Sequence, residues 1–174
     1  MIATTIQEIS LTDLNELQKI SKQTFYETFS KFNTKENMSK YLNDEFNTEK
    51  LKTELSSVDS YFFFAKSKTK YLGYLKLNIG NSQTEIKDKY GLEIERIYVL
   101  KEYQGKKIGQ ALFNKALHVA NQSNLKYIWL GVWEENIHAI NFYKKIGFIE
   151  FDKHIFMVGQ DKQIDILMRL ELPR

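Results

Sequence analysis

Hydrophobic and polar residues follow two different periods along this chain, and each period predicts one kind of element. Alternation of apolar and polar positions is typical of strands, whereas recurrence every three or four residues is typical of amphipathic helices. A nearly unbroken apolar run at residues 127–133 indicates a strand that is covered on both faces. The pattern predicts seven strands, at residues 3–9, 60–66, 70–79, 92–100, 127–133, 148–157 and 162–172.

Capping residues and apolar stripes predict the helices between these strands. Helices are expected after Ser10, from Thr34 to about residue 45, from Asn47 to Ser56, at 107–123 and at 136–146. The strands at 92–100 and 127–133 are joined through a helix, so they should lie parallel. The other strands are expected to pair mostly antiparallel, as in the hairpin around residues 67–70. The predicted fold class is therefore α+β, with helices flanking a mixed sheet.

Composition and charge narrow the class of protein. The chain has 174 residues, a formal net charge of +3 and no cysteine. This charge is too balanced to indicate a nucleic-acid partner, and the lack of cysteine fits a reducing cytoplasm. No export signal or membrane-spanning run is expected, and no repeat or linker divides the sequence. We expect one domain over residues 1–174, cytoplasmic, monomeric or homodimeric, with the aromatic run 61–64 in its core.

The loop at residues 104–110 carries the clearest chemical signal. Gly105 and Gly109 allow close backbone approach or a positive φ, and Lys106 and Lys107 add charge where a helix begins. Backbone N–H groups at a helix N-terminus favour a phosphate. The spacing fits neither a nucleotide-triphosphatase loop nor a dinucleotide-binding loop. By itself the loop could equally be a solvated helix cap.

Two segments of the chain resemble signatures of the GCN5-related N-acetyltransferase (GNAT) family. Residues 104–109 (QGKKIG) resemble its Gln/Arg-x-x-Gly-x-Gly/Ala pyrophosphate loop, and residues 136–148 (NIHAINFYKKIGF) resemble its second signature. Lys107 stands where the family has its middle glycine. We expect Lys107 in a right-handed first helical turn, where it still offers its backbone N–H.

The resemblance narrows to the Pai-type spermidine/spermine acetyltransferases of Gram-positive bacteria. It is carried by residues 46–55 (FNTEKLKTEL), 61–64 (YFFF), 92–98 (LEIERIY), 128–134 (IWLGVWE) and 141–148 (NFYKKIGF). It implies the GNAT fold, in which the two parallel strands splay apart at the centre of a sheet of about seven strands. It also implies direct transfer of an acetyl group from acetyl-CoA to a small amine, and the expected amine is a polyamine.

The resemblance implies coenzyme contacts at the splayed strands, the loop and the second signature. The backbone of Ile97, Tyr98 and Val99 is expected to pair with the pantetheine arm as an added strand would. The full set of expected coenzyme-binding residues is Ile97, Tyr98, Val99, Gln104, Gly105, Lys106, Lys107, Ile108, Gly109, Gln110, Asn136, Tyr143 and Lys145. Asn136 is equally suited to cap the helix that follows it.

Three residues are candidates for the chemistry. Glu93 and Glu95 are two apart on one strand, so both should project from the same face and could accept a proton from an ammonium group. Glu93 matches the family's general base by position, and Glu95 is expected nearer the thioester. Tyr143 matches the family's proton donor to the departing thiolate. Two alternatives remain. Glu93 and Glu95 could simply lie on a solvated strand face, and Tyr143 could be a packing residue.

Acceptor choice is assigned to the N-terminal helices and loop 80–90. Carboxylates and aromatic rings there suit a flexible polycation. The expected acceptor-binding residues are Tyr26, Glu27, Phe29, Tyr41, Glu93 and Glu95, with Glu36, Asp44 and Glu45 nearby. No metal site is expected, since His118, His138 and His154 lack metal-ligand spacing. Another amine as acceptor, or a coenzyme-sensing regulatory module with little turnover, remains an alternative function.

Overall fold

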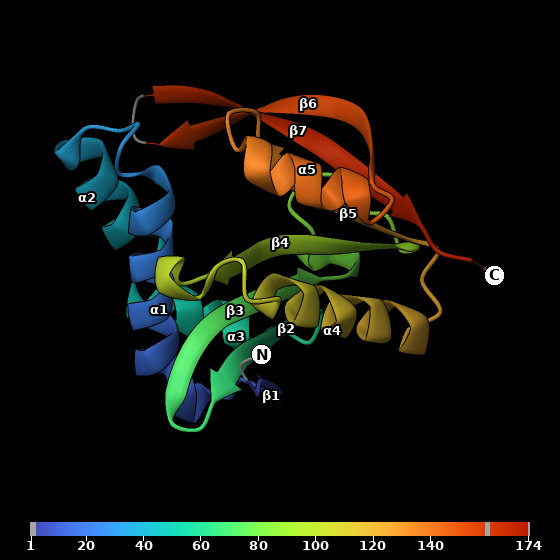
Figure 1. The fold of residues 1–174 in the computed structure, drawn as a ribbon, viewed down its shortest axis with the longest axis horizontal. Helices are drawn as coiled ribbons and strands as arrows, with labels where there is room; N and C mark the ends of the chain where they lie inside the picture. Colours follow the sequence, from blue (N-terminus) through green and yellow to red (C-terminus); the bar gives the residue numbers. More distant parts are fainter. Residues whose placement is uncertain (1–2, 159–160, 174) are drawn as a thin grey trace.

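The computed structural model describes residues 3–158 and 161–173. Within that part of the chain, seven strands form one sheet in the order β1-β2-β3-β4-β5-β7-β6 (Figure 1). The strands are β1 (Thr5–Glu8), β2 (Ser60–Ser67), β3 (Lys70–Asn78), β4 (Gly91–Val99), β5 (Tyr127–Trp133), β6 (Ile149–Val158) and β7 (Asp161–Glu171). Only the pair β4–β5 is parallel among these neighbours. The predicted mixed, mostly antiparallel sheet with a central parallel pair is therefore confirmed.

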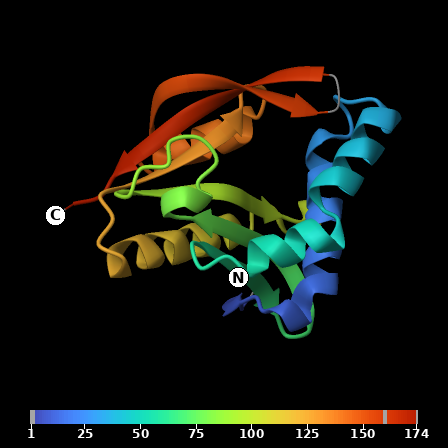
Figure 2. The same ribbon diagram turned by 180° about the vertical axis from the view of Figure 1, so that it is seen from behind.

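The helices lie on both faces of this sheet. They are α1 (Leu14–Phe29), α2 (Lys35–Glu45), α3 (Thr48–Leu55), α4 (Ile108–Gln122) and α5 (Ile137–Lys145), with short 3₁₀ turns η1 (Leu11–Asp13), η2 (Gly80–Ser82) and η3 (Lys101–Tyr103). Figures 1 and 2 show α4 and α5 on one side and α1 to α3 on the other. The predicted helix at 107–123 begins one residue later, at Ile108, and a 3₁₀ turn precedes α1.

Local hydrogen bonds explain where the helices begin. The Thr34 side chain accepts from the N–H of Asn37 at 3.1 Å, and the Asn47 side chain accepts from the N–H of Lys50 at 2.8 Å. Each bond satisfies a backbone donor that the first turn of a helix leaves free. The predicted caps at Thr34 and Asn47 are therefore confirmed.

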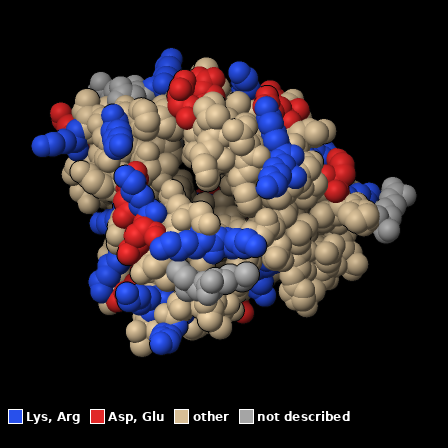
Figure 3. Space-filling view, in the orientation of Figure 1, with Lys and Arg blue, Asp and Glu red and all other residues tan. Residues whose placement is uncertain are grey.

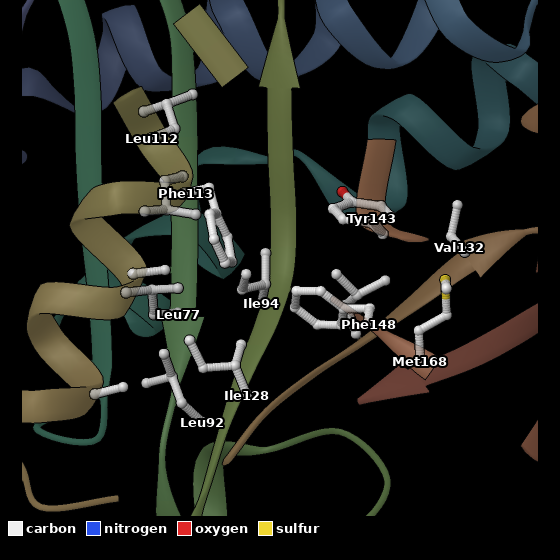
Figure 4. Packing of buried hydrophobic residues seen from close by; sticks show 14 of the residues in the cluster. Leu77, Leu92, Ile94, Leu112, Phe113, Ile128, Val132, Tyr143, Phe148 and Met168 are labelled. Carbon is white, nitrogen blue, oxygen red and sulfur yellow. The ribbon is translucent and has the colours of Figure 1, made fainter. Parts of the chain in front are cut away.

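Two hydrophobic layers hold the helices to the sheet. The larger layer lies under α4 and α5 and includes Leu92, Ile94, Leu112 and Phe148 (Figure 4). The second lies under α1 to α3 and includes Phe62 and Phe64, which confirms that the aromatic run is core. Burial of a large apolar side chain contributes about 1.5–3 kcal/mol. These layers fix the strands whose ends form the site.

The parallel pair separates soon after it begins. β4 and β5 pair only over Gly91–Glu93 and Tyr127–Trp129, although both strands continue. β4 then remains paired with β3, and β5 with β7. The expected splay of the two central strands is thus present, and it leaves an edge of each strand facing a gap.

A β-bulge in β4 changes which side chains share a face. Leu77 of β3 pairs with Ile94 and Lys76 pairs with Arg96, so Glu95 is the extra residue between them. Strict alternation would place Arg96 on the face opposite Glu95. Because of the bulge, Glu95 and Arg96 lie on the same face as Glu93, the face covered by α1 to α3.

Candidate active site

A cavity of about 1130 Å³ occupies the gap between the splayed strands. It is lined by β4 and β5, the N-terminal end of α4, α5, the C-terminal end of α1 and residues from α2, β6 and β7. Figure 3 shows a hollow in this face of the molecule, with basic side chains around it. The gap therefore opens to solvent and reaches into the sheet.

The edge of β4 that faces the cavity carries Ile97, Tyr98 and Val99, and all three residues line it. β4 has lost its pairing with β5 at this level. Backbone groups on such an edge are available to an extended partner. The pantetheine arm of a coenzyme is a partner of this kind, because it carries amide groups along a flexible chain.

The loop at residues 104–110 lies at one end of the cavity. Gly105 has φ +72°, and, apart from chain neighbours and the backbone of α4, no heavy atom of the described residues lies within 4 Å of where a Cβ would stand on Gly105 or Gly109. Within the same part of the chain, no side chain forms a capping hydrogen bond at the N-terminus of α4. The first turn of α4 therefore presents backbone donors and a positive dipole end to open space, which fits a pyrophosphate.

Two lysines of this loop differ in their placement. Lys107 lines the cavity but has φ +64° and ψ +13°, so the expected right-handed helical conformation is wrong. It is the left-handed N-cap residue, and it turns the chain from η3 into α4. Lys106 is not among the lining residues, and its Nζ donates to the carbonyl oxygen of Glu102 at 2.7 Å. The remaining expected coenzyme residues all line the cavity.

Glu93 is a buried carboxylate that accepts three hydrogen bonds. Its side chain accepts from the backbone N–H of Thr84 at 2.9 Å, from the Thr84 hydroxyl group and from Asn78 Nδ2 at 2.9 Å. It is 3% exposed. Burial raises the pKa of Glu93, and the bonds from Thr84 and Asn78 offset part of that rise. A carboxyl group with a raised pKa is suited to take a proton near neutral pH.

Glu95 lies beside Glu93 but is already engaged. Asn78 Nδ2 donates to both carboxylates, which confirms that the two side chains share a face. Glu95 also contacts Lys76 Nζ at 2.6 Å and Arg96 at 3.0 Å. Burial alone would raise the pKa of Glu95, but Arg96 and Lys76 outweigh it and lower the pKa. Glu95 is therefore the weaker base of the two.

Glu54 of α3 completes this buried group. It contacts Lys76 Nζ at 3.0 Å and Arg96 Nη1 at 2.8 Å. Two carboxylates and two cations are thus joined, and their charges cancel. Glu95 is consequently a member of a neutral ion-pair network, whereas Glu93 carries no such compensation.

Tyr143 projects from α5 into the packed side of the cavity. Its ring lies against Phe142 and Phe148, and Figure 4 shows its hydroxyl oxygen at the end of the ring nearer β4. Burial raises the pKa of Tyr143, so the phenol keeps its proton throughout the neutral range. Asn136 caps α5 by accepting from the N–H of Ala139 at 3.2 Å, and it also lines the cavity.

The part of the cavity lining that comes from α1 and α2 is aromatic and acidic. Phe29 and Tyr41 line it, and Phe25 stacks on Tyr41 with ring centroids 4.3 Å apart. Glu27 also lines it and fixes η3 by accepting from the N–H of Lys101 at 2.8 Å. Three residues from the expected acceptor region are not among the lining residues, namely Tyr26, which is 53% exposed, Glu36 and Asp44.

Sequence reasoning assigned acceptor choice to loop 80–90 without naming its residues, and it missed Asp165 and His154 as part of the cavity lining. Thr84 and Glu85 come from the loop before β4, Asp165 from β7 and His154 from β6, and all four line the cavity. Burial raises the pKa of Asp165 to about 6, with His154 opposing and Glu85 adding to the rise. The sequence signal that could have found Asp165 is a carboxylate within the apolar run 164–168.

The described residues also bear on other kinds of site. Among residues 3–158 and 161–173, no three or more His, Cys, Asp or Glu side chains are grouped so as to hold a metal ion. In the same ranges, no helix is both long and apolar enough to span a bilayer.

Comparison with known proteins identifies the family. The profile described as "Acetyltransferase (GNAT) family" matches residues 15–148. An uncharacterized N-acetyltransferase of Lactobacillus delbrueckii subsp. lactis is 40% identical over 172 residues, which is 99% of each chain. A spermidine N(1)-acetyltransferase of Thermoplasma acidophilum is 25% identical over 147 residues, or 82% of this chain and 86% of that one.

Solved structures share the fold of this chain. The crystal structure of the PaiA N-acetyltransferase of Thermoplasma acidophilum in complex with coenzyme A superposes with a TM-score of 0.81 at 23% identity, covering 98% of this chain and 100% of that one. The Escherichia coli ribosomal-protein-S18-alanine N-acetyltransferase has a TM-score of 0.73 at 17% identity, over 97% and 94% of the two chains. This chain belongs to the GNAT family and is an N-acetyltransferase that uses acetyl-CoA as its co-substrate.

Proposed function

We propose that the acceptor is a polyamine, such as spermidine or spermine, and that the acetyl group passes to it directly within a ternary complex. The observation that carries this proposal is the negative charge of one part of the cavity wall. Glu93, Glu85 and Asp165 line that wall. The basic side chains of the buried ion-pair network, Lys76 and Arg96, do not offset this charge, because Glu54 and Glu95 already neutralise them. An acceptor that carries positive charge is favoured there.

The aromatic side chains of the same region support a flexible cationic acceptor. Phe29, Phe32 and Trp133 line the cavity near the C-terminal end of α1, and Phe32 is 59% exposed. Ammonium groups bind over aromatic faces, and methylene chains pack on them. Similarity to a protein named spermidine N(1)-acetyltransferase adds independent support.

The candidate residues divide the proton transfers between them. Acetyl-CoA supplies the acetyl group as a thioester, which an unprotonated amine can attack. Glu93 accepts the proton that the acceptor nitrogen must lose, directly or through a water molecule. Tyr143 delivers a proton to the sulfur as the C–S bond breaks and the N–C bond forms. One proton thus leaves the nitrogen and one reaches the sulfur. Glu93 then releases the proton it took to solvent, and Tyr143 regains its own from solvent.

The remaining residues bind and orient. The N-terminus of α4 and Lys107 hold the phosphates, and the free edge of β4 aligns the arm that carries the thioester. Asn78 and Thr84 hold Glu93 in place. Such positioning accelerates a two-substrate reaction because it replaces a random encounter with a fixed geometry.

A thiol-release assay with acetyl-CoA tests the proposal. The panel contains spermidine, spermine, putrescine, butylamine, a peptide with a free N-terminus and an aminoglycoside. We expect the highest kcat/KM with spermidine or spermine. A higher kcat/KM for the peptide or the aminoglycoside would assign the same chemistry to another amine. Tight acetyl-CoA binding without turnover on any amine would instead favour a regulatory sensor.

A further inference from the structure

An exposed glycine marks open space in the middle of the sheet. Gly131 belongs to the central strand β5, yet it is exposed, whereas its neighbours Leu130 and Val132 are buried on the opposite face. Gly131 is one of the residues that line the cavity. The cavity therefore extends over Gly131 on the face that carries Glu93.

Asp165 stands at the side of this space. β7 pairs with β5 so that Asp165 is opposite Trp133, and its Oδ2 would lie 3.3 Å from a Cβ placed on Gly131. Its Oδ1 is buried and has no hydrogen-bond partner among the described residues. Buried carboxylate oxygens are nearly always hydrogen-bonded, so an unpartnered one beside a cavity indicates a donor that comes from a ligand.

Glu93 lies on the far side of the same space. It pairs in register with Trp129, which is two residues before Gly131. Asp165 pairs with Trp133, so the register levels of the two residues are four positions of β5 apart, or about 13 Å. The Asp165 side chain leans back toward Gly131, which shortens this span. The outer nitrogen atoms of an extended polyamine are separated by a comparable length, so one molecule can reach both carboxylates.

The groups around Asp165 leave the space negative. His154 is its cross-strand partner on β6, and His154 Nδ1 lies 3.3 Å from Glu85 Oε1 but has no hydrogen-bond partner among the described residues. Two carboxylates and one imidazole meet here, so the sum of their charges is negative whenever both carboxylates are ionised. A cation is the ligand that this arrangement favours.

We propose that Asp165 is an acceptor-binding residue whose carboxylate receives an ammonium group of the polyamine that is not acetylated, while Glu93 serves the reacting nitrogen. This inference rests on the proposed polyamine acceptor and goes beyond it by assigning the second ammonium site. It makes the distance between two nitrogen atoms, rather than the reacting amine alone, the feature that the enzyme selects.

The test compares D165N with D152N, both assayed with spermidine and with butylamine. Asp152 is an exposed residue of β6 that does not line the cavity, so D152N removes the same charge from the same hairpin. We expect D165N to raise KM for spermidine about 10- to 100-fold, the scale of a lost charged hydrogen bond. Its kcat and its KM for acetyl-CoA should stay near the parent values, and D152N should match the parent throughout.

Butylamine and a charge-preserving variant make the outcome decisive. Butylamine has no second ammonium group, so D165N and the parent should use it equally well, and D165E should retain a low KM for spermidine. An unchanged KM for spermidine in D165N, or an equal loss with butylamine, would overturn the role of Asp165. If the parent enzyme acetylates another amine but no polyamine, the proposal of a polyamine acceptor is itself refuted. That result is obtained before any variant is made, so it is distinct from a failure of the role of Asp165.

Discussion

The hydroxyl group of Thr84 gives the sharpest test of Glu93 as the base. Thr84 lies in the loop before β4 and donates to Glu93 both through its backbone N–H, at 2.9 Å, and through its hydroxyl group. Thr84→Val removes the hydroxyl donor, keeps the side-chain shape and leaves the backbone donor. Thr84→Ser keeps both donors and is the matched control.

The expected size of the effect comes from the contacts that remain. A hydrogen bond to a charged group contributes about 1.5–3 kcal/mol. Thr84 is exposed, so water can replace part of its bond and the lower end applies. A loss of about 1.4 kcal/mol weakens the ionisation of Glu93 about tenfold. The folded pKa of Glu93 is already raised by burial, so Thr84→Val raises it further.

The assay is kcat as a function of pH at saturating acetyl-CoA and amine. A base must be ionised to act, so activity falls as the pH drops through its pKa. We expect the acid limb of Thr84→Val to move upward by about one pH unit, while Thr84→Ser stays with the parent. Three superimposable acid limbs would refute the assignment of Glu93, because they would show that another group controls the profile.

Three further substitutions test the other parts of the site. Gly109→Leu should weaken acetyl-CoA binding more than tenfold, or about 1.4 kcal/mol. The reason is that the Cβ position of Gly109 is open, so a larger side chain fills the space beside the loop. Unchanged affinity by calorimetry in a folded variant would show that this loop is not part of the site. Tyr143→Phe should lower kcat about 10²-fold at unchanged acetyl-CoA affinity, and full activity would leave Tyr143 as a packing residue. Glu95→Gln should reduce stability in urea by about 3 kcal/mol, since it leaves Lys76 and Arg96 with Glu54 alone, and a stable variant that loses kcat as Glu93→Gln does would show that Glu95 is the base.

Local pattern was enough to predict most of the fold. Period-two alternation, together with the apolar run at residues 127–133, located the seven strands, and short-range capping located the starts of α2 and α3. Both signals depend on neighbours in the sequence, so they are readable without knowledge of the tertiary structure. The parallel pairing of β4 and β5 also followed from local information, since a helix joins the two strands.

The features that were missed depend on contacts between distant segments. The bulge at Glu95 is set by the pairing of β4 with β3, and it placed Arg96 in a network that strict alternation does not predict. The left-handed φ of Lys107 arises because the chain must turn sharply from η3 into α4, a conformation that local propensity disfavours for lysine. Asp165 reached the cavity only through the register of β7 on β5.

The raised pKa of Asp165 predicts that polyamine binding releases protons in a narrow pH window. The free enzyme holds this carboxyl group at a pKa of about 6, so near pH 6 it is about half protonated. An ammonium group at its side favours the ionised form and lowers the pKa, and the proton leaves on binding. At pH 8 the group is already ionised and little is released. Titration calorimetry of spermidine in two buffers of different ionisation enthalpy should therefore show a buffer-dependent heat at pH 6 that shrinks at pH 8 and is reduced in D165N. Equal heats in both buffers at pH 6 would mean that the ammonium group does not approach Asp165, and the second-ammonium site would have to lie elsewhere in the cavity.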